Sequence, residues 1–411
     1  MSYSRTRTNE KKRSRRKSRV RFLAVLNLVL LGLIAVVAFV WYYTDRMDNG
    51  VAQPAPVATE SFPNASPAAS AAEPSEESAD PSDSPIASES APPAESSDKI
   101  TFAFVGDILP ASSVARLMEK NGFDYPFRQT SALLQSADIT AGNLESSITE
   151  RGTPEQNKEY LYRGSALTLP AIKDAGFDVL SLANNHTLDY GWVGLQDTMD
   201  ALDDHKIKHM GSGLDDAEAF TPVYVESKGI TTAFIGVSNV VPNVGWKAGR
   251  NHPGVAETYD SSRAVEAIKA AKKNADLVVV MVHWGVEYTD KPIADQTLKG
   301  RKFIDAGADL VIGSHPHVLQ GFESYKGKWI AYSLGNFVFS GTKSPKSADT
   351  GLLTAECSKE GSCSLTLHPM KATSAQPAPM DEAAGKALLA HLSAVSTAAT
   401  VEENGEIVAN R

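Results

Sequence analysis

The chain has 411 residues with 40 basic and 49 acidic side chains, and its formal net charge of −9 conceals a strong asymmetry. Residues 1–21 hold ten of the basic residues and a single acid, which leaves 30 basic against 48 acidic residues downstream. A basic tail can indicate nucleic-acid binding, but the apolar segment that follows explains it better. We therefore expect no nucleic-acid partner.

Residues 22–43 predict one transmembrane helix. They contain no charged residue and end in Trp41-Tyr42-Tyr43, and about 20 apolar residues suffice to cross a bilayer core of about 30 Å. Basic residues beside a span stay in the cytoplasm, so the prediction is a single-pass protein of the cell membrane, with residues 1–21 cytoplasmic and the main domain extracytoplasmic. The alternative is a cleaved signal peptide, whose apolar region is shorter and precedes a small-residue cleavage site.

Residues 44–98 predict a disordered stalk. This stretch is rich in Ala, Ser, Pro and Glu, and residues 49–98 contain no Lys or Arg. Such a composition buries too little apolar surface to offset the entropy lost on ordering. The prolines extend the segment, so it would hold the following domain away from the bilayer.

Residues 99–370 predict an α/β domain in which short apolar strands alternate with helices, which favours a largely parallel or mixed sheet with helices on both faces. Strands are expected at Phe102–Val105, Ile139–Ala141, Val179–Ala183, Thr232–Val237, Leu277–Val282, Leu310–Ile312 and Ile330–Ser333. Helices are expected at Ser112–Lys120, Ser131–Ser136, Leu169–Ala175, Val193–His205, Ser261–Asn274 and Ala294–Ala306. Residues 371–411 predict a peripheral segment with a helix near Asp381–Leu392.

Polar side chains follow most of these strands, at the edge where ligands bind in open α/β sheets. Four of the nine histidines are among them. A single such histidine is usually a hydrogen-bonded core residue, but this number together with carboxylates indicates a metal site. The candidate metal residues are Asp107, Asn143, Glu145, Asn185, His283, His315 and His317.

Oxygen and imidazole ligands without thiolate suit one or two divalent transition-metal ions such as Mn, Fe or Zn. Two such ions can clamp a phosphoryl or carbonyl centre. His186 directly follows Asn185, so it would lie close enough to protonate a leaving group. Asp189 either orients the His186 imidazole or caps the next helix.

Several other residues keep two interpretations. Trp284 and Glu287 either contact substrate or pack beside the site, and Asn336 is expected to hydrogen-bond beside the metals. Cys357 and Cys363 flank a predicted hairpin turn, where they form a disulfide or remain two free thiols; an extracytoplasmic location favours the disulfide.

Six motifs resemble the CapA family of membrane-anchored capsule-biosynthesis proteins of poly-γ-glutamate producers, within the calcineurin-like metallophosphoesterase superfamily. The resemblance covers about residues 100–370 and implies a four-layer αββα sandwich of two mixed sheets flanked by helices. The motifs are Gly106-Asp107, Gly142-Asn143-Leu144-Glu145-Ser146, Asn184-Asn185-His186, His283-Trp284-Gly285-Val286-Glu287, Gly313-Ser314-His315-Pro316-His317 and Ser333-Leu334-Gly335-Asn336-Phe337.

The resemblance also assigns roles. Asp107 matches the first metal-binding aspartate of the family, and Asn185 and His186 match the metal-binding asparagine and the adjacent catalytic histidine. The three later metal histidines correspond to His283, His315 and His317.

Two positions depart from the superfamily pattern. Leu109 stands where the phosphoesterases have a metal-binding histidine two residues after the aspartate, and Asn143 replaces a bridging aspartate, with Glu145 as its possible substitute. Both departures are usual for CapA proteins and leave the number of metal ions and the reaction open.

Two classes of function follow from the resemblance. The protein is either a non-catalytic subunit of a membrane polyglutamate synthase, or a metal-dependent hydrolase acting on the anionic γ-glutamyl polymer or on a phosphorylated wall component. No ATP-grasp or ligase motif is present, so we do not expect it to form the amide bond itself.

Overall fold

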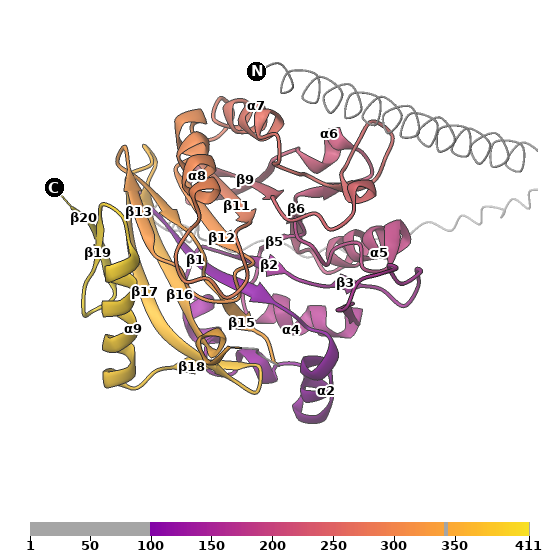
Figure 1. Ribbon diagram of the computed structural model, residues 1–411, viewed down its shortest axis with the longest axis horizontal. Coiled ribbons are helices and arrows are strands. Elements are labelled where there is room, and N and C mark those ends of the chain that lie inside the picture. Colours follow the sequence, from indigo (N-terminus) through magenta and orange to yellow (C-terminus); the bar gives the residue numbers. More distant parts are fainter. Residues whose placement is uncertain (1–98, 341–343, 411) are drawn as a thin grey trace, which may run out of the picture. The chain divides into compact units, whose positions relative to one another are not determined.

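The computed structural model describes residues 99–340 and 344–410 (Figure 1). The predicted cytoplasmic tail, the span at 22–43 and the stalk at 44–98 lie outside these residues. Within the described ranges, no helix combines the length and the apolar character that crossing a membrane requires.

The larger sheet combines parallel strands from the first half of the domain with antiparallel strands from its end. Its strands are β1 (Lys99–Ile108), β2 (Ile139–Leu144), β5 (Val179–Ser181), β6 (Lys208–Met210), β15 (Asn336–Val338), β16 (Asp349–Ser358), β17 (Cys363–Thr373), β18 (Gln376–Pro379), β19 (Ala399–Val401) and β20 (Glu406–Ala409). The path is β19-β20-β17-β16-β1-β2-β5-β6, with β15 beside β1 and β18 beside β17. β1 is parallel to β2 and β15 but antiparallel to β16.

The second sheet is built mainly from parallel strands with an antiparallel strand at each edge. Its strands are β8 (Val223–Ser227), β9 (Ile230–Ser238), β11 (Leu277–His283), β12 (Leu310–Ser314), β13 (Phe322–Tyr325) and β14 (Lys328–Ala331), in the order β13-β14-β12-β11-β9-β8. The Val-rich β11 is buried along its whole length, as expected for a strand that is covered on both faces.

Helices cover the outer faces of both sheets. These helices are α2 (Ser112–Asn121), α3 (Ser131–Leu134), α4 (Leu169–Asp174), α5 (Gly191–Asp204), the short α6 (Asp216–Ala219), α7 (Ser262–Ala271) and α8 (Ala294–Ala306). The last helix, α9 (Glu382–Val395), packs instead into the core that the two sheets share. α2 to α5 pack on the larger sheet, and α7 and α8 pack on the smaller one. The inner faces meet in a shared core, in which the rings of Phe102 and Phe234 lie 6.2 Å apart. The layer order is therefore helix, sheet, sheet, helix, around a mixed α/β core.

The C-terminal residues differ from the expected peripheral segment. β20 pairs with β17, and β19 pairs with β20, so the chain end extends the larger sheet. Leu389 and Leu392 of α9 and Ile407 of β20 are buried in the core that the two sheets share. The folded domain therefore runs to Ala409 and does not end near residue 370.

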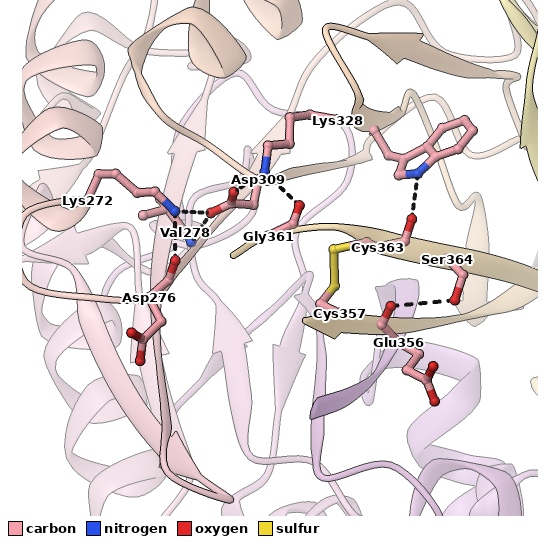
Figure 2. The surroundings of a disulfide bond; sticks show 11 residues. Lys272, Asp276, Val278, Asp309, Lys328, Glu356, Cys357, Gly361, Cys363 and Ser364 are labelled. Carbon is pink, nitrogen blue, oxygen red and sulfur yellow. Dashed lines mark hydrogen bonds and ion pairs between the residues drawn. A yellow bond between two sulfur atoms is a disulfide. The ribbon is translucent and has the colours of Figure 1, made fainter. Parts of the chain in front are cut away.

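A disulfide joins Cys357 and Cys363, which face each other across the β16–β17 hairpin (Figure 2). The turn between them is tied to the second sheet, because Lys328 Nζ donates to the Gly361 carbonyl at 2.6 Å. The same Lys328 lies 2.6 Å from the buried Asp309 carboxylate. The bridge thus fixes a hairpin end that contacts both sheets.

We expect Cys357→Ser to fold but to melt earlier than the wild type. A disulfide that closes so short a loop lowers the entropy of the unfolded chain and thereby stabilises the folded protein by about 2–3 kcal/mol. The substitution also places a serine hydroxyl where a fully buried sulfur was. Differential scanning calorimetry of the oxidised protein and the variant measures this. Quantitative alkylation of both cysteines in protein isolated without reductant would contradict the bridge.

Candidate metal centre

The polar residues predicted at the strand ends meet at one place, where the carboxyl ends of strands from both sheets come together. Asp107 lies near the end of β1, opposite Asn143 of β2 on one side and Asn336 of β15 on the other. The approach of β1 to the chain before β15 is very close, since a Cβ on Gly106 would lie 1.8 Å from the Gly335 carbonyl oxygen. From the second sheet, β11 ends at His283.

Two groups of ligand-type side chains lie within this cluster. The first consists of Glu145, His315 and His317, and the second of Asp107, Glu145 and His283. In each group the ligand atoms lie within 4.8 Å of one another, and every member is buried. Glu145 belongs to both groups, which is the arrangement expected of a residue that takes the place of the bridging aspartate.

Three of the four carboxylate oxygens of Asp107 and Glu145 lack a hydrogen-bond partner among the described residues. Asp107 Oδ2 and both carboxylate oxygens of Glu145 are buried without any such partner in the part of the chain that the structure describes. Burial, and then repulsion from Asp107, raise the pKa of Glu145 well above its usual value. His317 lies beside both carboxylates, with Nδ1 3.4 Å from Asp107 Oδ2 and Nε2 4.0 Å from Glu145 Oε1. One imidazolium compensates only one of two buried negative charges, and a buried charge without compensation is costly. The residues therefore fit one or two divalent metal ions.

The pKa values of the three histidines shift in opposite directions. Burial and the neighbouring imidazoles lower the pKa of His315 to about 3 and hold that of His283 well below its usual value. Burial also opposes charge on His317, but the Glu145 and Asp107 carboxylates outweigh it and raise its pKa to about 10. His283 and His315 are thus neutral imidazoles, the form that binds metals.

The His-x-His turn after β12 has a strained backbone. His315 and His317 have φ values of 95° and 56°, in the region that favours glycine. Such conformations persist only where the surrounding structure enforces them, and they concentrate at functional sites. Here the turn directs both imidazoles into the cluster.

Asparagines hold the candidate ligands in place. Asn143 donates to Asp107 Oδ1 at 2.8 Å, and its own oxygen accepts from Asn184 at 3.1 Å. Asn336 Oδ1 lies 2.9 Å from His317 Nδ1, and Asn185 Oδ1 lies 2.7 Å from His283 Nε2. Asn143 thus positions Asp107, and Asn185 presents its oxygen beside a candidate metal histidine.

His186 is held beside the cluster by Asp189, whose Oδ2 lies 2.7 Å from His186 Nδ1. Burial lowers the pKa of His186, and the hydrogen bond with Asp189 opposes that shift. Of the two interpretations of Asp189, the structure supports the orienting one, because α5 has no side-chain cap and its N-cap residue is Tyr190.

Two contributors to the site were not predicted from the sequence. Lys158 Nζ lies 3.0 Å from His186 Nδ1 and also hydrogen-bonds to Asp189 and to the Asn185 carbonyl. The Tyr162 ring lies 4.3 Å from the His186 ring. Both come from an irregular polar segment between β3 (Ser147–Ile148) and α4, where neither periodicity nor strand ends give a signal.

Trp284 and Glu287, the two remaining candidates, differ in burial. Trp284 is fully buried and donates from its indole nitrogen to the Tyr332 carbonyl at 2.8 Å, so it belongs to the core and not to a substrate surface. Glu287 is exposed and acts electrostatically on Glu145.

A divalent metal ion held by Asp107, Glu145 and the three histidines would supply positive charge that polarises a phosphoryl or carbonyl oxygen. The chain's own contribution is a positioned proton. His186, held at Nδ1 by Asp189, directs its other ring nitrogen away from that carboxylate, and this nitrogen carries a proton to donate only when the imidazole is charged.

Comparison with known proteins agrees with the motifs. Residues 101–341 match the family described as bacterial capsule synthesis protein PGA_cap. The PGA biosynthesis protein CapA of Bacillus subtilis (strain 168) is 34% identical over 316 residues, 76% of this chain and 82% of that one. The capsule biosynthesis protein CapA of Bacillus anthracis is 34% identical over 296 residues, 71% and 72% of the two chains.

Among solved structures, the chain is similar to the Haemophilus influenzae NAD nucleotidase, with a TM-score of 0.41 and 14% identity over 69% of this chain and 53% of that one. The sequence relatives and the family match decide the classification. The chain belongs to the PGA_cap family of bacterial capsule synthesis proteins, which confirms the resemblance that its motifs indicate.

Proposed function

We propose that this protein takes part in the synthesis, export or retention of a poly-γ-glutamate capsule, through a divalent metal ion bound at the strand-end cluster. The names of its Bacillus relatives support the capsule role. The observation that carries the metal role is the unpartnered Glu145 carboxylate shared by two groups of ligand-type residues. We place the protein in the cell membrane, as a single-pass anchor with its main domain extracytoplasmic.

The partners follow from this placement. The bilayer holds the predicted span, and the subunits of a membrane polyglutamate synthase supply the nascent polymer. The folded domain then acts on, or holds, an anionic γ-glutamyl chain outside the cell. The Cys357–Cys363 disulfide supports an oxidising compartment, where such bonds persist.

A complementation experiment tests the proposal. In a capsule-forming host whose own gene is deleted, the full chain is expected to restore surface polymer, and Asp107→Asn is expected not to restore it. Glu119→Gln, an exposed carboxylate change on α2 outside the cluster, serves as the control. If surface polymer is restored in cells grown without available transition metal, or by the Asp107→Asn variant, the metal site has no role in it.

A second function is favoured by a different observation. The buried His186–Asp189 pair resembles the proton-donating part of a hydrolase, and the superfamily suggested by the motifs contains phosphoesterases. An independent metal-dependent phosphoesterase or γ-glutamyl polymer hydrolase of the cell surface, with the metallophosphoesterase type of sandwich, is therefore the alternative.

The proposed topology predicts how protease treatment of cells will act. Protease added to intact cells or protoplasts is expected to release the folded domain by cutting within residues 49–98, because this predicted stalk would lie outside the membrane. Immunoblotting with an antibody against the C-terminal residues follows the release. Digestion only after lysis would place the domain in the cytoplasm.

A further inference from the structure

A groove of about 590 Å³ lies between α2 and the chain segment Phe339–Ser340. Two cationic side chains, Arg116 and Lys120, line it, and no aspartate or glutamate does. The remaining lining consists of serine, alanine, leucine and phenylalanine. The groove therefore presents positive charge next to small polar and apolar surfaces.

Both cations are available to an external anion. Arg116 and Lys120 are exposed and are four residues apart on α2, which places them on the same helix face. Neither forms an ion pair within residues 99–340 and 344–410. In a chain whose residues after 21 carry an excess of acids, a groove lined by two cations and no acid is suited to binding an anion.

A second cavity also contains two cations, but both are paired with carboxylates. The space of about 330 Å³ beside α9 also contains two lysines, Lys346 and Lys371. Each of them already lies beside a carboxylate of the same cavity, at 2.6 Å from Asp290 and 3.4 Å from Asp349. Its charges are internally compensated, so it attracts an anion less strongly.

The cationic groove adjoins the metal centre. α2 follows β1, the strand that carries Asp107. Phe339 contacts both the groove and the metal centre. The Phe339 ring, which lines the groove, lies 5.1 Å from the ring of His317 and 6.4 Å from that of Tyr162. Ser113 of α2 hydrogen-bonds to Ser340, which holds the two walls together. The Phe339 ring therefore lies between the groove and His317, and a chain in the groove would be one side chain away from a candidate metal ligand.

We propose that this groove binds the side carboxylates of a γ-glutamyl polymer as it passes the metal centre, an inference that rests on the proposed function. The guanidinium of Arg116 matches a carboxylate through two parallel hydrogen bonds, and Lys120 adds a second charge. The polymer repeats a carboxylate, an amide and methylene groups in every unit. The serines suit its amides, and Leu117 and Phe339 suit its methylenes.

The test measures binding of fluorescently labelled poly-γ-glutamate of defined length to the detergent-solubilised full chain by anisotropy. Arg116→Glu/Lys120→Glu is expected to lose affinity by about 10- to 100-fold, a change of about 1.4–2.8 kcal/mol, because two exposed charge contacts are lost and two repulsive carboxylates replace them. The matched control is Lys269→Glu/Lys273→Glu, the same charge change at two exposed lysines, also four residues apart, at α7 on the opposite helix layer. It is expected to bind like the wild type.

Three results would overturn the proposal: equal losses in the two double variants, no binding by the wild type, or tighter binding of a polyglycerol-phosphate teichoic acid that the groove variant abolishes. Metal content and Tm, measured on the same samples, show that the variant is folded and that its metal centre is intact. The groove proposal fails in the binding assay, whereas the proposed function fails in the Asp107→Asn complementation, so the two failures are distinguishable.

Discussion

Replacing Glu145 by glutamine is expected to remove the metal from the purified protein. Glu145 is the one residue that both ligand groups share, so its loss weakens both at once. The effect should exceed the roughly 10–100-fold decrease in affinity that loss of an outer contact causes at metal sites. Elemental analysis of the full chain, purified without chelators, measures the bound metal.

The stability of the metal-free protein gives this prediction a second readout. Without metal, the wild type keeps two buried carboxylates that repel each other. Glu145→Gln removes one charge, so the metal-free variant is expected to melt no lower than the metal-free wild type. Adding metal should raise the Tm of the wild type alone, because only a bound ligand stabilises the folded state.

Glu287→Gln is the control for Glu145→Gln, since it neutralises an exposed carboxylate at the same cluster. This variant should keep its metal and its response to chelators. A Glu145→Gln protein with full metal content would show that the shared carboxylate is not a ligand.

His186→Ala is expected to keep the metal and to lose turnover by about 10²–10⁴-fold if the protein is a hydrolase, which is the usual contribution of a general acid. His186 belongs to neither ligand group, so metal content should not change. Hydrolysis of p-nitrophenyl phosphate and shortening of poly-γ-glutamate, followed by size-exclusion chromatography, are the two activity measurements.

The same variant separates the two proposed functions in cells. Normal surface polymer with His186→Ala would favour the synthase-subunit role, whereas polymer of altered amount or length would favour the hydrolase. His205→Ala is a suitable control, because His205 contacts the Ala201 carbonyl at the end of α5, away from the cluster. A loss of metal in His186→Ala would contradict its assignment outside the ligand set.

The sequence predicted the cluster well because its members obey one simple rule. Asp107, Glu145, His283 and the His-x-His pair all follow buried apolar strands, and parallel strands bring such positions to one edge. Lys158 follows no strand. The segment that carries Lys158 is anchored at Glu155. The Glu155 backbone N–H donates to the Asp189 carbonyl at 2.8 Å, and its side chain accepts from the Trp246 indole at 3.0 Å. These long-range contacts have no local sequence pattern.

The end of the domain was misjudged for a related reason. β19 and β20 have three and four residues, too few for an alternating pattern to separate a sheet edge from a polar tail. The Ala-rich composition of α9 likewise conceals that Leu389 and Leu392 fill the space between the sheets. Tertiary packing, and not local propensity, decides the structure of residues 371–409.

The position of β1 determines when the site can form during synthesis. β1 is the first strand of the described residues, yet it is hydrogen-bonded to β15 and β16, which are about 230 to 260 residues further along the chain. Closing such long loops is entropically costly and delays folding. Asp107 therefore reaches its place beside Asn336 of β15 only after most of the domain has been synthesised. A chain that stops before β16 contains every candidate metal residue but lacks the strand that pairs with β1 along Lys99–Phe104, so we expect it to hold Asp107 less firmly.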